Sequence, residues 1–445
     1  MSIKIYRRVT KVALLILFSI SIKVTYAQQI QFAKTYPFVT KAAAYSFVQL
    51  NDSGFLMAGE YGVSGNGHRA MMIRIDKYGD TLWTKKFPSL GGMYDIIMLD
   101  DTTVMVTVSI TPITIIKYSI NGDSLGAYSY NIGASEVSVA IYKTKDKGYI
   151  MSNGSASYGF LKLDSAFNEQ WHDYKNMCCG GMLVPDIDGG YVGVGKGGSD
   201  VQPYMVQRRD SAGNILWNYQ YGNESPWAND DYASDVLILP DSNYLVSCAL
   251  GNSWQLMKIN RNNGDTMWTK EIYPISLTYA MDYYSGNRYL LGGGVDFIID
   301  ENGDSLWTSI KSWGMFIAYD IHPTSDGGFA QCGYSGGGAS QVISFVKYDS
   351  LGNTVFTSVL DPENNLQTLS LYPNPATDKL YINAGTMLNE KKLVFTLTDL
   401  QGRSVLNTLY EASTPIDVSA LPNGIYIATL KGKEKEVRGK VIIQR

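Results

Sequence analysis

The sequence predicts an all-β protein: a seven-bladed β-propeller followed by a small immunoglobulin-like β-sandwich. Three observations support this prediction. A polar turn followed by a large aromatic residue recurs about every 45 residues through most of the chain. The segments between these turns alternate apolar and polar residues and are bounded by Gly, Asp, Asn and Ser, which is typical of strands and hairpin turns. A second set of β-like segments follows a polar stretch that contains proline, and no amphipathic helix of ordinary length is found.

The repeated turn has the pattern Asp-x-x-Gly-Asp/Asn, and an aromatic residue follows three positions later. The aromatic residues of its copies are Trp83, Trp171, Trp217, Trp268, Trp307 and Phe356, and a degenerate copy occupies Ile120–Gly126. From Trp83 to Phe356 there are six steps in 273 residues. A period near 45 with only strand-like segments indicates a propeller, and we count seven units between about Ala43 and Leu360.

Each unit contains four strand-like runs, enough for one blade. The segment Gln31–Phe38 resembles the outer strand of a blade but precedes the first complete unit. We expect it to pair with the last blade and close the ring, because closure removes two open sheet edges.

The repeated aromatic residue is expected to pack against the next blade, because it recurs in nearly every unit. The pattern resembles the tryptophan-docking repeats of quinone-dependent dehydrogenase propellers and of outer-membrane assembly propellers. This resemblance supports the fold but does not support the cofactor. We expect no cofactor, no metal and no catalytic residue that the sequence can identify.

The N-terminus reads as a signal peptide over residues 1–27. Basic residues precede the apolar run Val12–Ile22, and Thr25 and Ala27 supply small residues at a cleavage site, so the mature chain would begin at Gln28. The leader contains five of the 37 basic residues, which leaves 32 basic against 41 acidic residues and a net charge of −9. An acidic exported protein is not expected to bind nucleic acid.

The tail is predicted to be a separate domain. Residues 28–360 would form the propeller, the polar stretch Asp361–Thr368 a linker, and residues 369–445 a small β-sandwich. Its predicted strands are Leu369–Tyr372, Lys379–Asn383, Leu393–Asp399, Ser404–Leu409, Thr414–Val418, Gly424–Lys431 and Val437–Gln444.

Motifs in this tail occur in a familiar order. They contain Tyr372, Pro373, Asn374 and Pro375, then Asp399 with Gly402, then Leu421, Pro422, Gly424 and Tyr426, and a basic ending at Lys440. Over about 75 residues the tail closely resembles the type A C-terminal sorting domain of the type IX secretion system of Bacteroidota. The resemblance implies passage through that secretion machinery to the cell surface or the medium. In that family the tail is commonly removed and the protein is often attached to surface lipopolysaccharide. Whether this tail is cleaved stays open.

Several short motifs lack the structural setting that their chemistry needs. Gly333–Gly337 matches G-x-S-x-G and Gly193–Gly198 matches G-x-G-x-x-G, but neither is expected to precede a helix. Asp186 and Asp188 hint at calcium, but the loop lacks a Glu at its twelfth position, so we favour a structural turn. The three histidines fall in different repeats without ligand spacing: His68, His172 and His322.

Four cysteines remain in the mature chain, and the sequence does not determine their pairing. They are Cys178, Cys179, Cys248 and Cys332. Their compartment is oxidising, but their sparse spacing does not describe a disulfide scaffold. A structural disulfide and buried free thiols both stay open.

Asp followed by Ser or Thr and an apolar residue recurs through the repeats. This resembles the O-glycosylation acceptor of exported Bacteroidota proteins, whereas turn capping by the Asp and Ser side chains explains the same repetition without sugar. The hydroxyl residues are Thr81, Ser124, Ser165, Ser211, Thr266, Ser305 and Ser350.

We expect an exported binding or adhesion module with an unidentified carbohydrate or protein ligand. The aromatic residues that break the blade pattern are candidates for the ligand loops: Trp227, Trp254, Trp313 and Tyr334. The alternatives are an extracellular polysaccharide hydrolase or lyase built on the propeller, which would need paired carboxylates or a Tyr nucleophile on one face, and a structural surface-layer component.

Overall fold

The computed structural model divides into two compact units, Met1–Thr357 and Ser358–Arg445. It describes residues 29–444 except 38–40, 63–66, 132–137, 154–158, 174–181, 197–203, 222–231, 251–252, 273–277, 310–315, 338–340, 355–368, 384–392, 400–402, 411–413 and 433–435. The predicted leader and the predicted linker therefore lie outside the described residues.

In the first unit, the described strands form seven four-stranded antiparallel sheets, as the sequence predicts. We number them blades 1 to 7 in chain order. Blades 1 to 3 are β2 (Ala42–Gln49), β3 (Phe55–Gly62), β4 (His68–Ile75) and β5 (Thr81–Phe87); β6 (Met93–Asp100), β7 (Thr103–Val108), β8 (Ile113–Ser119) and β9 (Ser124–Tyr130); and β10 (Ser138–Lys143), β11 (Tyr149–Asn153), β12 (Gly159–Leu163) and β13 (Glu169–Asp173).

Blades 4 to 7 repeat the same antiparallel order. They are β14 (Leu183–Pro185), β15 (Tyr191–Lys196), β16 (Tyr204–Arg209) and β17 (Ile215–Tyr221); β18 (Tyr232–Ile238), β19 (Tyr244–Leu250), β20 (Ser253–Ile259) and β21 (Thr266–Glu271); β22 (Thr278–Tyr283), β23 (Tyr289–Gly293), β24 (Asp296–Ile299) and β25 (Ser305–Ser309); and β26 (Phe316–Pro323), β27 (Phe329–Ser335), β28 (Val342–Tyr348) and β1 (Phe32–Tyr36).

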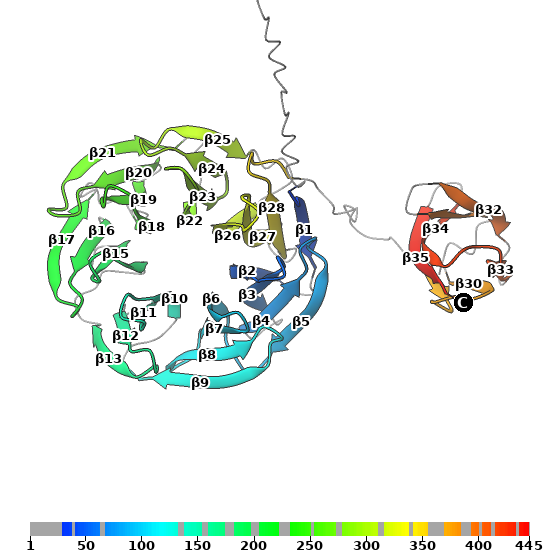
Figure 1. The fold of residues 1–445 in the computed structure, drawn as a ribbon, viewed down its shortest axis with the longest axis horizontal. Helices are drawn as coiled ribbons and strands as arrows, with labels where there is room; N and C mark the ends of the chain where they lie inside the picture. Colours follow the sequence, from blue (N-terminus) through cyan, green and yellow to red (C-terminus); the bar gives the residue numbers. More distant parts are fainter. Residues whose placement is uncertain are drawn as a thin grey trace, which may run out of the picture. The chain divides into compact units, whose positions relative to one another are not determined.

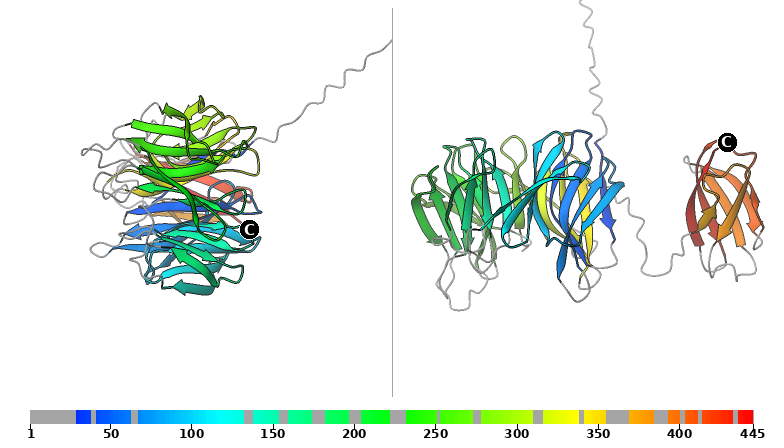
Figure 2. Two further views of the ribbon diagram at one scale, coloured as in Figure 1. Left: turned by 90° about the vertical axis from the view of Figure 1, so that its left-hand side faces the viewer. Right: turned by 90° about the horizontal axis from the view of Figure 1, so that it is seen from below.

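The blades stand around a central axis with the first strand of each blade innermost (Figure 1). The side views show that the strands run between the two faces of the ring (Figure 2). The ring is closed by the N-terminal strand, because β1 pairs antiparallel with β28 as the outer strand of blade 7. The predicted role of Gln31–Phe38 is thereby confirmed for its strand Phe32–Tyr36.

Neighbouring blades meet through an aromatic residue that packs on a glycine. The outer-strand tryptophan of one blade lies against the turn glycine of the next, where a Cβ on Gly303 would lie 2.8 Å from the Trp268 ring. These glycines adopt positive φ angles, 77° at Gly303, which other residues rarely tolerate. The pairs are Trp83 with Gly122, Trp171 with Gly213, Trp217 with Gly264, Trp268 with Gly303, and Trp307 with Gly352.

A sixth contact of this kind, between blades 7 and 1, closes the ring. Phe32 lies opposite Lys347 on β28, as Trp83 lies opposite Arg74 on β4, and the Phe32 ring packs on Gly79 of blade 1. Phe356, which the sequence pattern favours for this place, lies outside the described residues. The N-terminal strand thus supplies the aromatic residue at the last interface.

At the interface of blades 2 and 3 the aromatic residue and the glycine have exchanged places. Gly126 lies opposite Lys117, the register position that tryptophan holds in the other blades. Phe167 stands where the next turn elsewhere has glycine, at a φ of 66°, and its ring lies 4.6 Å from that of Tyr128 and 5.0 Å from that of Tyr149. The degenerate repeat is therefore compensated by its neighbour.

This exchange predicts an epistatic pair. Phe167→Gly should lower the free energy of unfolding by about 1–3 kcal/mol, because it removes two ring contacts and apolar burial. Adding Gly126→Trp should restore much of the loss, since nothing lies within 4 Å of the position of a Cβ on Gly126. Chemical denaturation of the two single variants and the double variant measures this coupling, and additive losses would contradict it.

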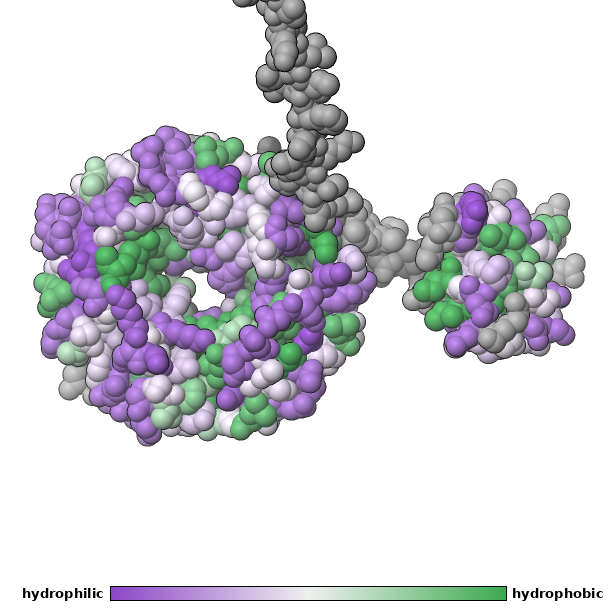
Figure 3. Space-filling model, viewed as in Figure 1, coloured by the Kyte–Doolittle hydropathy of each residue, from purple (hydrophilic) through white to green (hydrophobic). Residues whose placement is uncertain are grey.

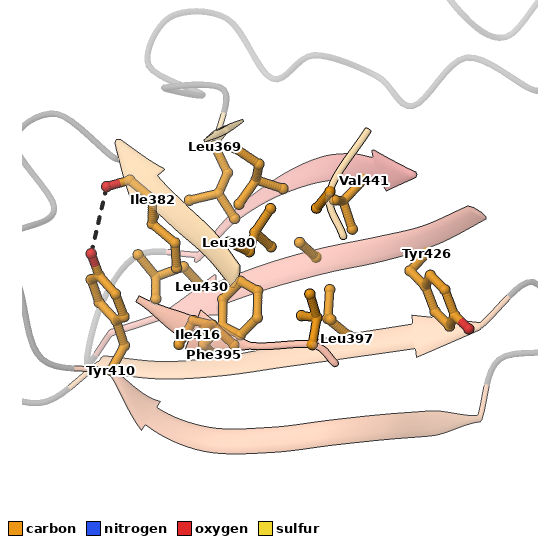
Figure 4. Close-up of a cluster of buried hydrophobic side chains, with 14 of the residues drawn as sticks. Leu369, Leu380, Ile382, Phe395, Leu397, Tyr410, Ile416, Tyr426, Leu430 and Val441 are labelled. Atoms are coloured by element: carbon orange, nitrogen blue, oxygen red, sulfur yellow. Dashed lines mark hydrogen bonds between the residues drawn. The ribbon is translucent and has the colours of Figure 1, made fainter. Parts of the chain in front are cut away.

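The second unit is a β-sandwich of two sheets. One contains β29 (Ser370–Tyr372), β30 (Lys379–Asn383) and β33 (Ile416–Asp417), and the other contains β32 (Ser404–Tyr410), β31 (Leu393–Asp399), β34 (Gly424–Lys431) and β35 (Glu436–Ile443). The strands agree closely with those predicted from sequence. Alternate residues point inward to form the core in Figure 4, where the Tyr410 hydroxyl donates to the Ile382 carbonyl.

Across the part of the chain that the structure describes, no helix is long and apolar enough to cross a membrane.

Candidate functional site

The inner strands of six blades carry a β-bulge at one equivalent position. A bulge places an extra residue in one strand and re-aims its side chain, so two successive residues can face the same side. Here that side is the central channel, whose lining includes both Tyr319 and the next residue, Asp320. The bulge residues are Tyr45, Tyr94, Val139, Ser234, Tyr279 and Tyr319.

The channel along the axis encloses a cavity of about 550 Å³. The space-filling view shows the ring hollowed at its centre (Figure 3). Most of its lining comes from the bulge position and from the first and third positions after it. The lining residues at the first position are Ser46, Asp95, Ala140, Asp235, Ala280 and Asp320. Those at the third position are Ile97, Tyr142, Leu237, Asp282 and His322.

Tyrosines form a continuous arc at the bulge position of blades 6, 7, 1 and 2, which we call the tyrosine half-ring. The ring centroids of Tyr45 and Tyr94 lie 4.7 Å apart, those of Tyr45 and Tyr319 lie 4.9 Å apart, and those of Tyr279 and Tyr319 lie 5.4 Å apart. Tyr334 on β27 adds a fifth ring, 5.6 Å from Tyr319. Stacking of this kind holds the side chains in a fixed arrangement.

A buried carboxylate supports the half-ring. Glu60 on β3 is 6 % exposed, and its Oε1 accepts a hydrogen bond of 2.6 Å from the Tyr45 hydroxyl and lies 2.8 Å from Nδ1 of His68. Burial and the neighbouring Glu60 raise the pKa of Tyr45 well above its usual value, and the same causes raise the pKa of Tyr94 to about 12. These hydroxyls therefore stay protonated at neutral pH.

Three aspartates just after the bulges link each blade to the next. Oδ2 of Asp235 in blade 5 accepts a hydrogen bond of 2.6 Å from the backbone N–H of Met281 in blade 6. The other two do the same: Asp95 accepts from Ile141 at 2.8 Å, and Asp320 accepts from Phe47 at 3.1 Å. These three carboxylates have a structural role at the channel wall.

Two of these linking aspartates hold protons unusually tightly. Burial raises the pKa of Asp95 to about 6 and that of Asp235 to about 7, although backbone N–H groups favour the charged form of both. The desolvation cost of charge exceeds the benefit of those hydrogen bonds.

His322 lies between two carboxylates. Its Nδ1 lies 2.7 Å from Asp282 Oδ2 and its Nε2 lies 3.0 Å from Asp320 Oδ1. Burial opposes the charged form of His322, but the two aspartates outweigh burial and raise its pKa well above the ordinary value. The pKa of Asp320 is lowered, because His322 and hydrogen-bond donors outweigh the effect of burial. With both ring nitrogens engaged, His322 has no free nitrogen to act as a general base.

The four predicted loop aromatics have different outcomes. Tyr334 lies beside the half-ring, as described above. Trp254 lies on β20 rather than in a loop, and at 6 % exposure it packs in a core cluster with Leu256 and Phe297, so its predicted loop position is wrong. Trp227 and Trp313 lie outside the described residues.

The predicted glycosylation positions fall at two different places in the turn. Ser165, Ser211 and Ser350 follow a capping Asp, as where Asp164 Oδ1 accepts from the N–H groups of Ala166 and Asn168 at 2.8 Å. The others begin the outer strands: Thr81, Ser124, Thr266 and Ser305. All are exposed except the partly buried Ser350. Capping accounts for the first group, and sugar attachment stays a prediction for all seven.

The other sequence motifs lie within strands and turns. Gly193 is on β15 and Gly333 on β27. Asp188 sits in a hairpin turn and pairs with Arg208 at 2.6 Å, as Asp326 pairs with Lys347 at 3.0 Å in blade 7. Among the described residues, no three His, Cys, Asp or Glu side chains converge as metal ligands.

The cysteines are only partly described. Cys332 is a buried free thiol, and Cys248 is buried in blade 5. Cys178 and Cys179 lie outside the described residues, so their pairing stays open.

The motif residues of the tail serve its own fold. Asn374 Oδ1 accepts a hydrogen bond of 2.8 Å from the N–H of Ile442, which holds the segment of Tyr372, Pro373 and Pro375 beside the last strand. The exposed ring of Tyr372 stacks on Tyr381 at 5.7 Å.

The remaining motif residues lie near two turns of the sandwich. Asp399 accepts from the Arg403 N–H at 2.9 Å and pairs with its guanidinium at 2.8 Å. Leu421 is buried, and Tyr426 donates a hydrogen bond of 2.8 Å to the Pro422 carbonyl just before β34 begins at Gly424. Lys440 lies on β35 opposite Ile427, and Gly402 lies outside the described residues.

The tyrosine half-ring is the feature that sequence reasoning missed. A signal was present: Tyr or Ser, then often Asp or Ser, then an apolar residue recurs at the start of the repeats, as in Tyr45-Ser46-Phe47, Tyr94-Asp95-Ile96, Ser234-Asp235-Val236 and Tyr319-Asp320-Ile321. Sequence alternation alone assigns neighbouring residues to opposite faces of a strand. The bulge overturns that assignment.

Comparison with known proteins identifies the tail. Residues 370–444 match the family described as the secretion system C-terminal sorting domain. The type IX sorting domain predicted from the sequence is thereby confirmed, and it marks the chain for export to the cell surface or the medium. No curated protein matches the sequence significantly.

Several solved structures are similar to this chain at low identity. The extracellular domain of BT4673 from B. thetaiotaomicron is 12% identical, with 93% of this chain and 59% of that chain covered and a TM-score of 0.46. The WD40 β-propeller domain of Doa1 is 11% identical, with 71% of this chain and 96% of that chain covered and a TM-score of 0.49. BamB from Moraxella catarrhalis is 13% identical, with 68% of this chain and 85% of that chain covered and a TM-score of 0.40. The chain thus spans 59% of the BT4673 domain. Because these TM-scores are below 0.5, the propeller assignment rests on the sheet order.

Proposed function

We propose that this exported propeller is a binding or adhesion module, and that its ligand enters the axial channel past the tyrosine half-ring. A predicted N-terminal leader would start export and the sorting domain would complete it through the type IX machinery. Attachment to surface lipopolysaccharide after removal of the tail belongs to the same proposal.

The half-ring is the observation that carries this proposal. Four blades place a tyrosine at one register position, and neighbouring rings contact one another in stacked, tilted and edge-to-face pairs along one cavity. Packing between blades is already supplied by the outer-strand aromatic residues, so a second aromatic layer at the axis is not needed to hold the ring. Tyrosine presents a large rigid contact area with a polar tip, which suits it to recognition of sugars or peptides.

The polysaccharide hydrolase or lyase is supported less well. A glycosidase needs one carboxyl group to donate a proton and a second to attack or to activate water. The channel carboxylates instead accept backbone N–H groups of the next blade or pair with His322. Release of oligosaccharide from glucan or pectin by the full chain would revive this alternative.

A tyrosine substitution tests the site. A glycan array or a peptide panel first identifies a ligand. Tyr319→Ala should weaken the binding of that ligand by at least about tenfold, because the Tyr319 side chain lies at the centre of the half-ring. Tyr78→Ala is a matched control, since Tyr78 is 54 % exposed in an outer turn far from the channel lining. Equal binding by the wild type and the Tyr319 variant would contradict the proposed site.

A further inference from the structure

Negative charge dominates the described channel lining. Four aspartates line the cavity, whereas His322 and Lys143 are its cationic residues. His322 shares its charge between Asp282 and Asp320. Lys143 donates a hydrogen bond of 3.1 Å to the Leu99 carbonyl. With four aspartates against two cationic residues, the lining has a formal charge of −2, which is smaller in magnitude below the pKa of Asp235, about 7. Low-dielectric walls strengthen the field of such charges.

A buried carboxylate next to the half-ring has an oxygen that lacks a donor. Both hydrogen bonds to Glu60 go to Oε1, and its buried Oε2 has no hydrogen-bond partner among the described residues. A Cβ on Gly92 would lie 2.7 Å from Oε2 and 3.5 Å from the Tyr94 ring, so this oxygen lies close to the Tyr94 end of the half-ring. A buried charged oxygen without a donor is costly, so it favours a ligand that supplies positive charge nearby.

Aromatic rings beside carboxylates are the chemistry that recognises organic cations. The face of a tyrosine ring attracts an ammonium or guanidinium group, and the attraction grows when water is excluded. Neutral sugar would gain from the rings but not from the charges. A divalent metal is disfavoured because the wall aspartates already accept backbone N–H groups, and no metal-binding cluster occurs among the described residues.

We infer that the channel takes the cationic side chain of a basic peptide segment, with its ammonium or guanidinium group between the tyrosine half-ring and the wall carboxylates. This inference rests on the proposed function, which places the ligand in the channel. The cavity of about 550 Å³ is in the range of pockets that hold small ligands, about 300–1,000 Å³. A flexible lysine or arginine stem can enter it while the peptide backbone stays at the mouth.

The probe is trilysine amide with an acetylated N-terminus, and its matched control is the same peptide acetylated also on each Nε, which removes the side-chain charges and keeps the stems. Calorimetric titration of the full chain should give at least about tenfold tighter binding for the charged peptide. The affinity for the charged peptide should fall as the sodium chloride concentration rises from 50 to 500 mM, because the attraction is electrostatic.

A charge variant locates the site. Asp282→Asn should weaken trilysine binding by at least about fivefold, since it removes one wall charge. Glu301→Gln makes the same charge change on an exposed turn and should alter binding less than twofold. Thermal unfolding of both variants checks that they are folded. The comparison with the acetylated peptide uses the wild-type protein and so does not depend on the folding of a variant.

The outcomes separate this inference from the proposed function. If trilysine does not bind, or if the acetylated peptide binds equally well, the cationic ligand is excluded. A neutral ligand whose binding is lost in Tyr319→Ala would then still support the channel as the binding site. If trilysine binds but neither Asp282→Asn nor Tyr319→Ala weakens it, binding lies elsewhere and both proposals fail.

Discussion

Phe32→Ala is expected to lower the free energy of unfolding by about 3–5 kcal/mol, the range for loss of a fully buried phenylalanine. Phe32 is 1 % exposed, stacks on Phe345 at 5.9 Å and packs on Gly79 of blade 1. It lies on the strand that joins the two ends of the ring, and no covalent bond holds that strand to blade 7. Loss of this side chain should therefore loosen the closure of the whole propeller.

Thr35→Ala on the same strand is the matched control. Thr35 is exposed on β1, so its truncation should change stability by less than about 0.5 kcal/mol. Denaturant titration followed by tryptophan fluorescence measures both variants, and limited proteolysis reports opening at blade 7. Equal stability of the Phe32 and Thr35 variants would show that β1 is not needed for closure.

Asp235→Ala is expected to lower the free energy of unfolding by about 2–6 kcal/mol at pH 5. The carboxyl oxygens of Asp235 accept from the N–H of Val236 at 2.7 Å and from that of Met281 in the next blade at 2.6 Å. Truncation leaves both buried donors without an acceptor, and each such donor costs about 1–3 kcal/mol. Glu301→Gln, an exposed change of one acidic residue, should cost little.

The effect of Asp235→Ala should shrink as the pH rises. The native pKa of Asp235 is about 7 and lies above its ordinary value of 3.8, because burial disfavours the charged form. The native state therefore holds a proton that the unfolded state has already lost. This contribution to stability is complete below pH 3.8 and disappears as the pH rises through about 7. The slope is at most about 1.4 kcal/mol per pH unit.

Denaturant titrations of wild type and variant at pH 5, 6, 7 and 8 measure this change. A difference in the free energy of unfolding between wild type and variant that stays constant across these pH values would mean that Asp235 ionises near its ordinary pKa. A difference that grows as the pH rises would contradict the predicted direction.

Local sequence patterns were sufficient for the repeated parts of the fold. The turn of each blade is encoded by its own residues, as where Asp210 caps the N–H groups of Ala212 and Asn214 at 2.9 and 2.8 Å. The same holds for the strands of the tail, whose alternating residues give nearly the bounds observed. In both cases the interactions that define the element are close in sequence.

Contacts between distant residues were harder to predict. The repeat pattern favours Phe356 at the last interface, whereas the pairing of β1 with β28 places Phe32 there and brings together residues more than 300 positions apart. Trp254 breaks the repeat pattern in sequence, yet its position on β20 buries it between strands of blades 5 and 6. The environment of such a residue depends on neighbours that no local pattern specifies.

The sequence by itself determined the number of blades, the sandwich tail and the route of export, because each depends on a repeated or contiguous motif. Only the tertiary structure decided where the proposed ligand site lies. The half-ring joins Tyr279, Tyr319, Tyr45 and Tyr94 from four blades, and bulges turn these side chains toward the axis. Closing the ring brings the first two blades beside the last two, and that closure assembles the half-ring.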